Sequence, residues 1–322
     1  MPEPPAAQGV RLEWRAVPEQ VQLTFERWAG SRVASTTTQP SGFSPGVAAR
    51  VRLADGRGMF VKAIGPWPNA ESPAMHRREG RIVSALPPNV PVPRLRWSHD
   101  EGEGGWVLLI FEQVDGRHPA QPWRLAELDR VLEGLAQLAE RLSPSPLSVQ
   151  DVGSASEIVA TRICGWQHLC GAAPEELLQL DTWSRQHLDR LADLEAQAPS
   201  AVAGDTLLHF DVRADNVLLE SERVWFFDWP HACVGAAWFD VVGFAPSVTM
   251  QGGPPPEEVF AQYRGTAVAD PQAVTRGLAA VAGYFTRQSL QPAPAGLPTL
   301  RAFQAAQGVV ARRWLARRTG WR

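Results

Sequence analysis

The chain has 322 residues, of which 44% are hydrophobic and 20% charged, a composition typical of globular domains. Its formal net charge of −3 provides no surplus of basic residues, so we expect no nucleic-acid partner. The longest apolar run, residues 106–111, is far too short to cross a bilayer, and residues 1–9 lack the apolar stretch of a signal peptide. We therefore expect a cytoplasmic protein without a membrane partner.

The first third of the sequence predicts strands and a single helix. Residues 47–53 and 59–64 have strand-like patterns and flank a hairpin signal at Asp55-Gly56. Residues 73–86 predict a helix that ends at a pair of prolines. Residues 105–112 predict a buried strand, after which the chain turns away.

One residue in the second predicted strand stands out by its type. Lys62 is the only lysine of the chain, against 30 arginines. An ammonium group on a flexible stem acts as a compact point charge that can reach a phosphate inside a cleft. A residual charge at the edge of a strand is the alternative interpretation of Lys62.

The rest of the chain predicts a mostly helical structure. Residues 123–142 carry leucines at helical spacing, beginning at Leu125, and predict a helix with a core-facing stripe. Residues 174–196 have the same character, a short hairpin is expected at 217–228, and helices then continue to the C-terminus. We expect an N-terminal lobe of residues 1–113 and a helical C-terminal lobe of residues 114–322.

The three cysteines, Cys164, Cys170 and Cys233, cannot all pair with one another. Cys164 and Cys170 also lack the close spacing of a zinc-binding pair. We expect buried, reduced thiols.

The strongest chemical signal begins at His209 and reads His-Phe-Asp-Val-Arg-Ala-Asp-Asn. The expected hairpin follows directly and ends at Asp228-Trp229, so Asp211, Asn216 and Asp228 should lie close together. Asp211 is suited to orient an acceptor hydroxyl and take its proton, and the other two offer hard oxygen ligands for Mg²⁺. This arrangement predicts phosphoryl transfer.

These residues resemble the catalytic loop and metal-binding turn of the protein-kinase-like superfamily. The Asp-Trp pair at 228–229 is similar to the aminoglycoside phosphotransferase branch of that superfamily. The resemblance implies an α+β, two-lobed fold, in which an antiparallel sheet with one helix faces a helical lobe.

The resemblance also implies a nucleotide site in the N-terminal lobe. Lys62 matches the lysine that contacts the phosphates, and Glu79 matches its helix partner, with Glu71 as a weaker candidate. The loop that covers the phosphates falls on Ser41, Gly42, Phe43 and Ser44, although it lacks the full glycine pattern. The backbone of Glu112 and Val114 falls where such proteins bind a purine.

Three residues depart from the family pattern or extend it. Arg213 takes the place of the usual His or Lys, and we expect it to stabilise charge on the transferred phosphoryl group. Asp215 is either a further metal ligand or an outward-facing polar residue, and the second interpretation is preferred. Asp240 is expected to cap a helix or to support the catalytic loop.

The sequence thus predicts a Mg²⁺-dependent enzyme that transfers phosphate from ATP or GTP to a hydroxyl of a small molecule. An antibiotic or related natural product is the first candidate acceptor, with antibiotic resistance as one possible role. After Asp270 the chain has eight arginines but no Asp or Glu, which disfavours a polycationic aminoglycoside. The alternatives are a kinase of a sugar or other metabolic alcohol and a catalytically silent nucleotide-binding scaffold. We expect a monomer or a homodimer.

Overall fold

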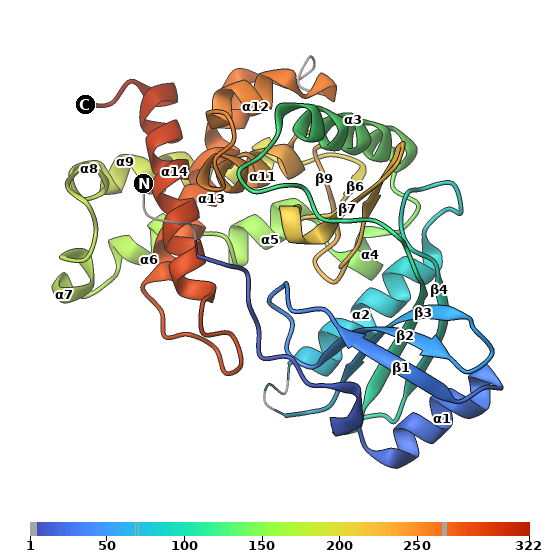
Figure 1. Cartoon of the computed structure of the whole chain (residues 1–322). Helices are drawn as coiled ribbons and strands as arrows, with labels where there is room; N and C mark the ends of the chain where they lie inside the picture. The colour runs from blue at the N-terminus through green and yellow to red at the C-terminus, as the bar shows by residue number, and fades with distance from the viewer. Residues whose placement is uncertain (1–4, 68, 70, 266–268) are drawn as a thin grey trace.

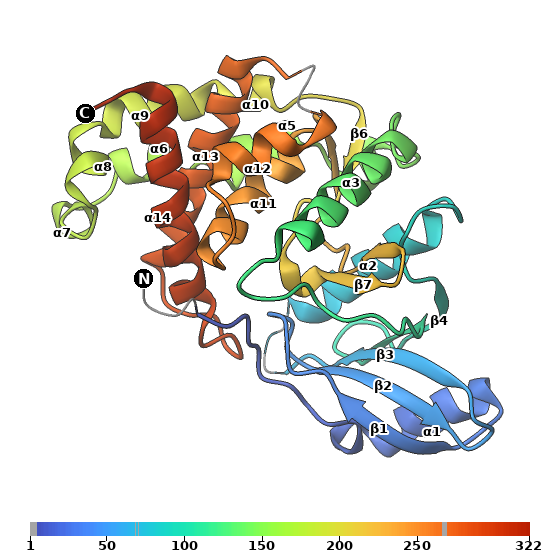
Figure 2. The same ribbon diagram turned by 45° about the horizontal axis from the view of Figure 1, so that its top comes forward.

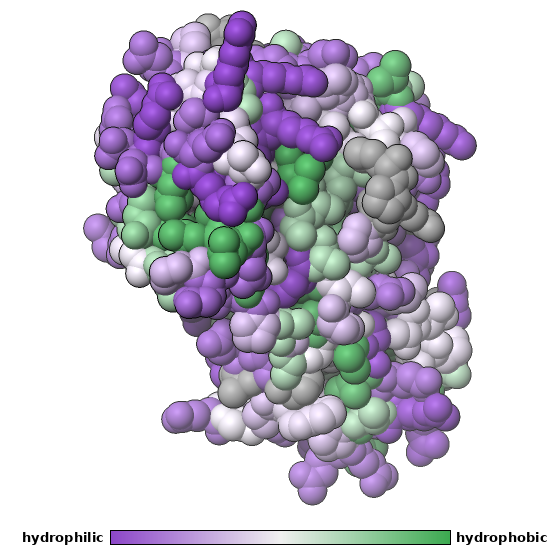
Figure 3. Space-filling view, turned by 90° about the vertical axis from the view of Figure 1, so that its left-hand side faces the viewer, coloured by the Kyte–Doolittle hydropathy of each residue, from purple (hydrophilic) through white to green (hydrophobic). Residues whose placement is uncertain are grey.

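Two lobes of different secondary structure make up the molecule (Figure 1). Residues of both lobes line a cleft. The computed structural model describes residues 5–67, 69, 71–265 and 269–322. Seen from the side, a broad upper lobe narrows into a smaller lower lobe, and hydrophilic side chains cover much of both (Figure 3). Within the described residues, no helix combines the length and apolar character needed to cross a bilayer.

The N-terminal lobe is built on a five-stranded antiparallel sheet with the order β1-β2-β3-β5-β4. Its elements are the 3-10 helix η1 (Trp14–Ala16), α1 (Glu19–Ala29), β1 (Val33–Thr38), β2 (Val47–Leu53), β3 (Gly58–Ile64), α2 (Ser72–Ala85), β4 (Leu95–Asp100) and β5 (Val107–Glu112). This lobe holds one more α-helix, α1, than the sequence predicted, and the strands β1 and β4 were also missed. Strand β1 was missed because four of its six residues are exposed and its pattern is not apolar.

The sheet is covered on both faces, which explains the unbroken apolar run of β5. Leu108 and Ile110 face the core shared with α1, where Phe25 is fully buried. Leu109 and Phe111 point to the opposite side and belong to the large core that continues into the C-terminal lobe. The N-terminal lobe therefore has a core of its own on the α1 side, while the other face of its sheet joins the core of the C-terminal lobe.

The C-terminal lobe is mostly helical and carries two small two-stranded sheets. Its elements are α3 (Leu125–Arg141), α4 (Val149–Val152), α5 (Ala155–Thr161), α6 (Gly165–Cys170), α7 (Pro174–Leu177), α8 (Thr182–Gln186), α9 (Leu188–Ala196), α10 (Ala198–Ala201), β6 (Thr206–Leu208), the 3-10 helix η2 (Ala214–Asn216), β7 (Val217–Glu220), β8 (Arg223–Phe226), β9 (Cys233–Gly235), α11 (Phe239–Met250), α12 (Pro256–Gln262), α13 (Pro271–Ser289) and α14 (Leu300–Thr319). The long helices α13 and α14 pack along each other (Figure 2).

The expected fold class, an antiparallel sheet lobe joined to a helical lobe, is confirmed, but three details were wrong. The helical stretch at 174–196 is three short helices, because Asp181 accepts a hydrogen bond from the Ser184 amide (2.9 Å) and starts a new helix there. Leu125 begins α3 but is 62% exposed, so the core-facing stripe starts one turn later. Cys170 is exposed, whereas Cys164 and Cys233 are buried, and all three are free thiols.

Candidate active site

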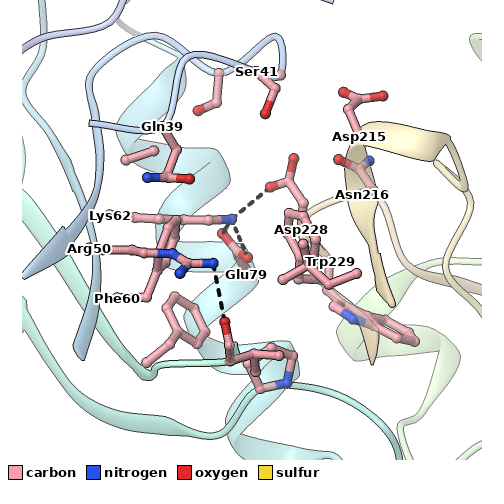
Figure 4. A pocket seen from close by; sticks show the side chains of 18 of the residues that line it. Gln39, Ser41, Arg50, Phe60, Lys62, Glu79, Asp215, Asn216, Asp228 and Trp229 are labelled. Carbon is pink, nitrogen blue, oxygen red and sulfur yellow. Dashed lines mark hydrogen bonds and ion pairs between the residues drawn. The ribbon is translucent and has the colours of Figure 1, made fainter. Parts of the chain in front are cut away.

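The cleft between the lobes encloses about 990 Å³ of empty space, part of it open to solvent. Strands β2, β3 and β5 form one wall, and the hairpin β7–β8 with the residues around it forms the other (Figure 4). Its lining combines apolar side chains, among them Phe60, Val83, Phe111 and Leu218, with charged groups around Lys62. A cavity with apolar and charged walls can take a ring with a charged tail.

Lys62 lies at the centre of these charged groups and holds two carboxylates. Its Nζ lies 2.6 and 2.8 Å from the two oxygens of Glu79 and 2.8 Å from Oδ1 of Asp228. In this triad Lys62 and Glu79 are 8% and 2% exposed, while Asp228 keeps 22% of its side chain exposed toward the cleft. Burial lowers the pKa of Lys62, but the charges of Asp228 and Glu79 outweigh it and raise the pKa above the usual range. The lysine is therefore charged.

Local packing brings Glu79 to this lysine. Lys62 lies mid-strand in β3, between Ala48 of β2 and Leu109 of β5. Gly80 faces Leu109, and a Cβ at Gly80 would lie only 3.0 Å from the Leu109 side chain, so the glycine allows α2 to pack close to the sheet. The predicted Lys62–Glu79 ion pair is thus present. The weaker candidate, Glu71, is exposed and precedes the first residue of α2.

The segment after β6 forms a loop whose backbone is unusual. Phe210 has a φ of +66° and Asp228 a φ of +70°, a left-handed conformation that is uncommon for residues other than glycine. Asp240 stabilises the first of these turns, since its carboxylate accepts hydrogen bonds from the amides of His209 (2.8 Å) and Phe210 (2.7 Å). The N-cap of α11 is Trp238, so Asp240 supports the loop and does not cap the helix.

His209 joins the two halves of the site as a neutral residue. Its Nε2 lies 2.9 Å from the carbonyl oxygen of Phe227, directly before Asp228. Burial lowers the pKa of His209 to about 4, so the imidazole is uncharged near neutral pH. The amide of Asp211 donates to Nδ1 (3.3 Å), which assigns the remaining ring proton to Nε2. His209 therefore fixes the spacing between Asp211 and Asp228.

Arg213 organises a second triad in the same loop. Its Nη1 lies 2.6 Å from Oδ1 of Asp211, and its Nε and Nη2 lie 3.1 and 3.0 Å from the two oxygens of Asp215. Asp215 is only 8% exposed, so the preferred interpretation of an outward-facing residue was wrong. Burial raises the pKa of Asp211 above its usual value, although the charge of Arg213 opposes this shift.

Asn216 and Asp228 have the donor chemistry of a magnesium site. The side-chain nitrogen of Asn216 donates to the backbone carbonyl of Asp211 (2.8 Å) and to its Oδ2 (3.1 Å), which leaves the amide oxygen as an acceptor. Asp228 is ionised, because Lys62 lowers its pKa far below the usual range despite burial. Two hard oxygen groups suit a Mg²⁺ ion that also binds water and substrate phosphates. Among the described residues, no group of three or more His, Cys, Asp or Glu side chains is placed to hold a metal.

The predicted phosphate-covering loop does form a roof over the cleft. Ser41, Gly42 and Ser44 line it, and Gly42 has a φ of +93°. Phe43 turns the other way, toward the C-terminal lobe, where its ring meets Phe303 edge-on at 5.2 Å between centroids. Phe43 therefore attaches the loop to α14 and is not among the residues that line the cleft.

The predicted purine-binding segment, Glu112 and Val114, also lines the cleft. The side chain of Glu112 bonds to the Arg94 amide (3.0 Å) and to Arg96 (2.7 Å), so it points away toward β4. The carbonyl of Val114 accepts a bond from Arg50 Nη2 at 3.3 Å (Figure 4). Sequence reasoning missed Arg50, as it missed Arg11 and His118, which also line the cleft. Their positions depend on tertiary contacts, and no motif marks them.

The geometry agrees with a comparison to known protein families. A family model described as the phosphotransferase enzyme family matches residues 41–284, about three quarters of the chain. The chain belongs to the phosphotransferase enzyme family. It is a small-molecule phosphotransferase, and the family resemblance expected from the sequence is confirmed.

Solved structures of other phosphotransferases share the fold. A thermostable variant of aminoglycoside phosphotransferase APH(4)-Ia, in a ternary complex with AMP-PNP and hygromycin B, is 15% identical with a TM-score of 0.60, and the match covers 92% of this chain and 98% of that one. Spectinomycin phosphotransferase APH(9)-Ia, with ADP and spectinomycin, is 12% identical with a TM-score of 0.60, covering 93% and 98%. The GDP and kanamycin complex of APH(2")-IIIa is 14% identical with a TM-score of 0.60, covering 94% and 98%.

At these identities the likeness establishes the fold of the phosphotransferase and nothing about its substrate. No curated protein sequence matches the chain significantly.

Proposed function

We propose that this phosphotransferase transfers the γ-phosphoryl group of ATP or GTP to a hydroxyl of a small molecule in a Mg²⁺-dependent reaction. The observation that carries the proposal is that Lys62 and Glu79 from the N-terminal lobe meet Asp228 from the C-terminal lobe across the cleft, with Asn216 bonded to Asp211 on the Asp228 side. The N-terminal lobe, residues 1–113, would bind the nucleotide, and residues 114–322 would supply catalysis and the acceptor site.

The base and the phosphates of the nucleotide would bind to different residues of the cleft. The base would lie against the apolar side chains next to the backbone of Glu112 and Val114, and the phosphates would lie under the loop of Ser41, Gly42 and Ser44. Lys62, held by Glu79, offers a fixed positive charge to those phosphates. The similar proteins include complexes with AMP-PNP, ADP and GDP, which supports a purine nucleotide and leaves ATP and GTP as alternatives.

Asn216 and Asp228 would hold the Mg²⁺ ion, which would neutralise charge on the phosphates. Asp211 would accept the proton of the acceptor hydroxyl while the hydroxyl oxygen forms a bond to the γ-phosphorus. The bond between that phosphorus and the β–γ bridging oxygen breaks, and the nucleoside diphosphate leaves. Arg213 holds Asp211 at 2.6 Å and thereby orients the base. No covalent enzyme intermediate is needed, since positioning and charge neutralisation supply the catalysis.

The acceptor would carry little positive charge. Helices α13 and α14, which pack near the catalytic loop, contain no acidic residue. Acids from other elements that do reach α14 are already paired, Asp181 with Arg312 at 2.7 Å and Glu257 with Arg318 at 2.7 Å. An uncharged or weakly charged natural product, antibiotic or sugar would therefore fit better than a polycation. We place the reaction in the cytoplasm, where nucleotides are abundant and thiols stay reduced.

A phosphorylation screen tests this function. The purified protein would be incubated with Mg²⁺, ATP or GTP, and a panel of antibiotics, nucleosides, sugars and amino sugars, with products read by mass spectrometry. We expect the mass of one phosphate to be added to at least one compound, and no product from Asp211→Asn. Nucleotide binding without any product across the panel would instead favour the silent scaffold.

A further inference from the structure

The N-terminal segment, residues 5–13, forms part of the roof of the cleft. It runs from the C-terminal lobe near α14 down to the sheet lobe (Figure 1). Two backbone hydrogen bonds join it to Gly42 of the phosphate-covering loop and two more to Gly46 just after the loop. On its other side, Val10 donates to the carbonyl of Gly296 (2.8 Å). The matched family region begins at residue 41, so this segment lies outside it.

One side chain of the segment enters the cleft. The guanidinium of Arg11 donates to the backbone carbonyls of Ser41 and Ser44 and so holds the two ends of the loop. It lines the same cavity as Lys62 and Asp228. A Cβ at Gly42 would lie 2.9 Å from Arg11 Nη2 and 4.0 Å from Asp215 Oδ2, which places the guanidinium near the Asp215 carboxylate.

Arg11 has more donors than the protein satisfies. A guanidinium carries five N–H donors, and two hydrogen bonds to the loop are present. Its Nε is a buried nitrogen without a hydrogen-bond partner in the described part of the chain. Nη1 and Nη2 each carry a second N–H beyond the one donated to the loop, and because Arg11 lines the cleft these two donors are the ones open to a ligand that brings acceptor oxygens. Burial lowers the pKa of Arg11 below its usual value, although the nearby charges of Asp228 and Asp215 oppose this shift.

We propose that Arg11 is a phosphate-binding residue of this enzyme: its guanidinium contacts the phosphate chain of the nucleoside triphosphate while holding the 41–44 loop over it. The inference rests on the proposed nucleotide site. Arg11 would then supply a second cation above the phosphates, opposite Lys62 below them. A planar fork suits this role because it can bond to the loop and to a phosphate at once.

The experiment measures nucleotide binding by calorimetry, with Mg²⁺ and either AMP-PNP and adenosine or GMP-PNP and guanosine, whichever pair the wild type binds. Arg11→Gln should weaken binding of the triphosphate analogue about 10- to 100-fold and change nucleoside binding less than about twofold. Arg11→Lys, which keeps the charge, should recover part of the loss. The matched control is Arg15→Gln, four residues away, whose side chain is 83% exposed and paired with Glu13. It should bind both ligands like the wild type.

The outcomes distinguish a failure of the proposed role of Arg11 from a failure of the proposed function. Unchanged binding of the triphosphate analogue by Arg11→Gln would overturn the role of Arg11 alone. An equal loss of nucleoside and triphosphate binding would overturn it as well, because that pattern indicates a structural role only. A wild type that binds no nucleotide would overturn the proposed function. If Arg11→Gln fails to fold, Arg11→Lys decides, with wild-type binding of the analogue counting against the proposal.

Discussion

The candidate active site contains two triads in which one cation holds two carboxylates, and they are built differently. Lys62 joins Glu79 and Asp228, residues 17 and 166 positions away in sequence. Arg213 joins Asp211 and Asp215, which are each two positions away. The lysine triad therefore depends on how the two lobes meet, while the arginine triad belongs to one loop.

The difference follows from the two cations. Lys62 offers one nitrogen that three carboxylate oxygens share, so a phosphate can compete for it without dismantling the site. Arg213 uses its planar fork to fix two carboxylates in direction as well as distance. The first arrangement suits binding of a substrate, and the second suits orientation of a base.

Removing the base should have the largest effect. Asp211→Asn should lower kcat about 1,000-fold, because the amide cannot take the hydroxyl proton, while nucleotide affinity stays within a few-fold of the wild type. Turnover by product mass spectrometry and binding by calorimetry measure the two effects. The control is Asp205→Asn, an exposed aspartate just before β6. If Asp211→Asn retained turnover, Asp211 would not be the base that accepts the hydroxyl proton.

The contribution of Asp240, which supports the catalytic loop, to the free energy of unfolding should depend on pH. Burial raises the pKa of Asp240 from 3.8 to about 6, against the two backbone hydrogen bonds that lower it. The folded protein thus keeps this proton to a higher pH than the unfolded chain. The corresponding stabilisation is full below about pH 4 and is lost as the pH rises through about 6, a change of about 3 kcal/mol in the free energy of unfolding.

Asp240→Asn cannot ionise, so its free energy of unfolding should lack this contribution between pH 4 and 6. Urea unfolding of both proteins across that range measures the difference in slope. An identical slope in the variant would show that Asp240 titrates normally.

The lysine triad should not tolerate an arginine. Lys62→Arg puts a longer, planar group at a position where the native lysine is only 8% exposed. It should lower kcat about 100-fold while the unfolding temperature changes little. The control is Arg52→Lys, an exchange between the same two residue types on the exposed side of the adjacent strand β2, which should leave kcat unchanged. Near-normal turnover of Lys62→Arg would return Lys62 to the interpretation of a residual strand charge.

Replacing the planar guanidinium of Arg213 should lower kcat less than the change at Lys62. Arg213→Lys keeps a positive charge near Asp211 but cannot hold both carboxylates, so we expect kcat to fall about 10-fold with the KM for nucleotide nearly unchanged. Arg223→Lys, on β8 against Trp225, serves as the control. A larger rise in KM than fall in kcat would show that Arg213 binds nucleotide and does not orient the base.

Sequence reasoning worked best where the chemistry is concentrated in a short segment. The loop from His209 to Asn216, the hairpin β7–β8 and Asp228 all follow from local spacing, and the structure places them together. Lys62 and Glu79 could be paired because a strand and the following helix are adjacent in the fold. Asp215 was misread because its neighbours in sequence do not reveal that Arg213 turns inward.

The sequence by itself determined the two-lobe order, the hairpins and the residue types needed for phosphoryl transfer. Periodicity and turn residues encode these features locally. Only the tertiary structure decided that Asp240 supports the catalytic loop, that Phe43 packs against α14 and that Arg11 enters the cleft beneath the loop. These contacts join segments 30 to 260 residues apart, and such distances leave no local pattern in the chain.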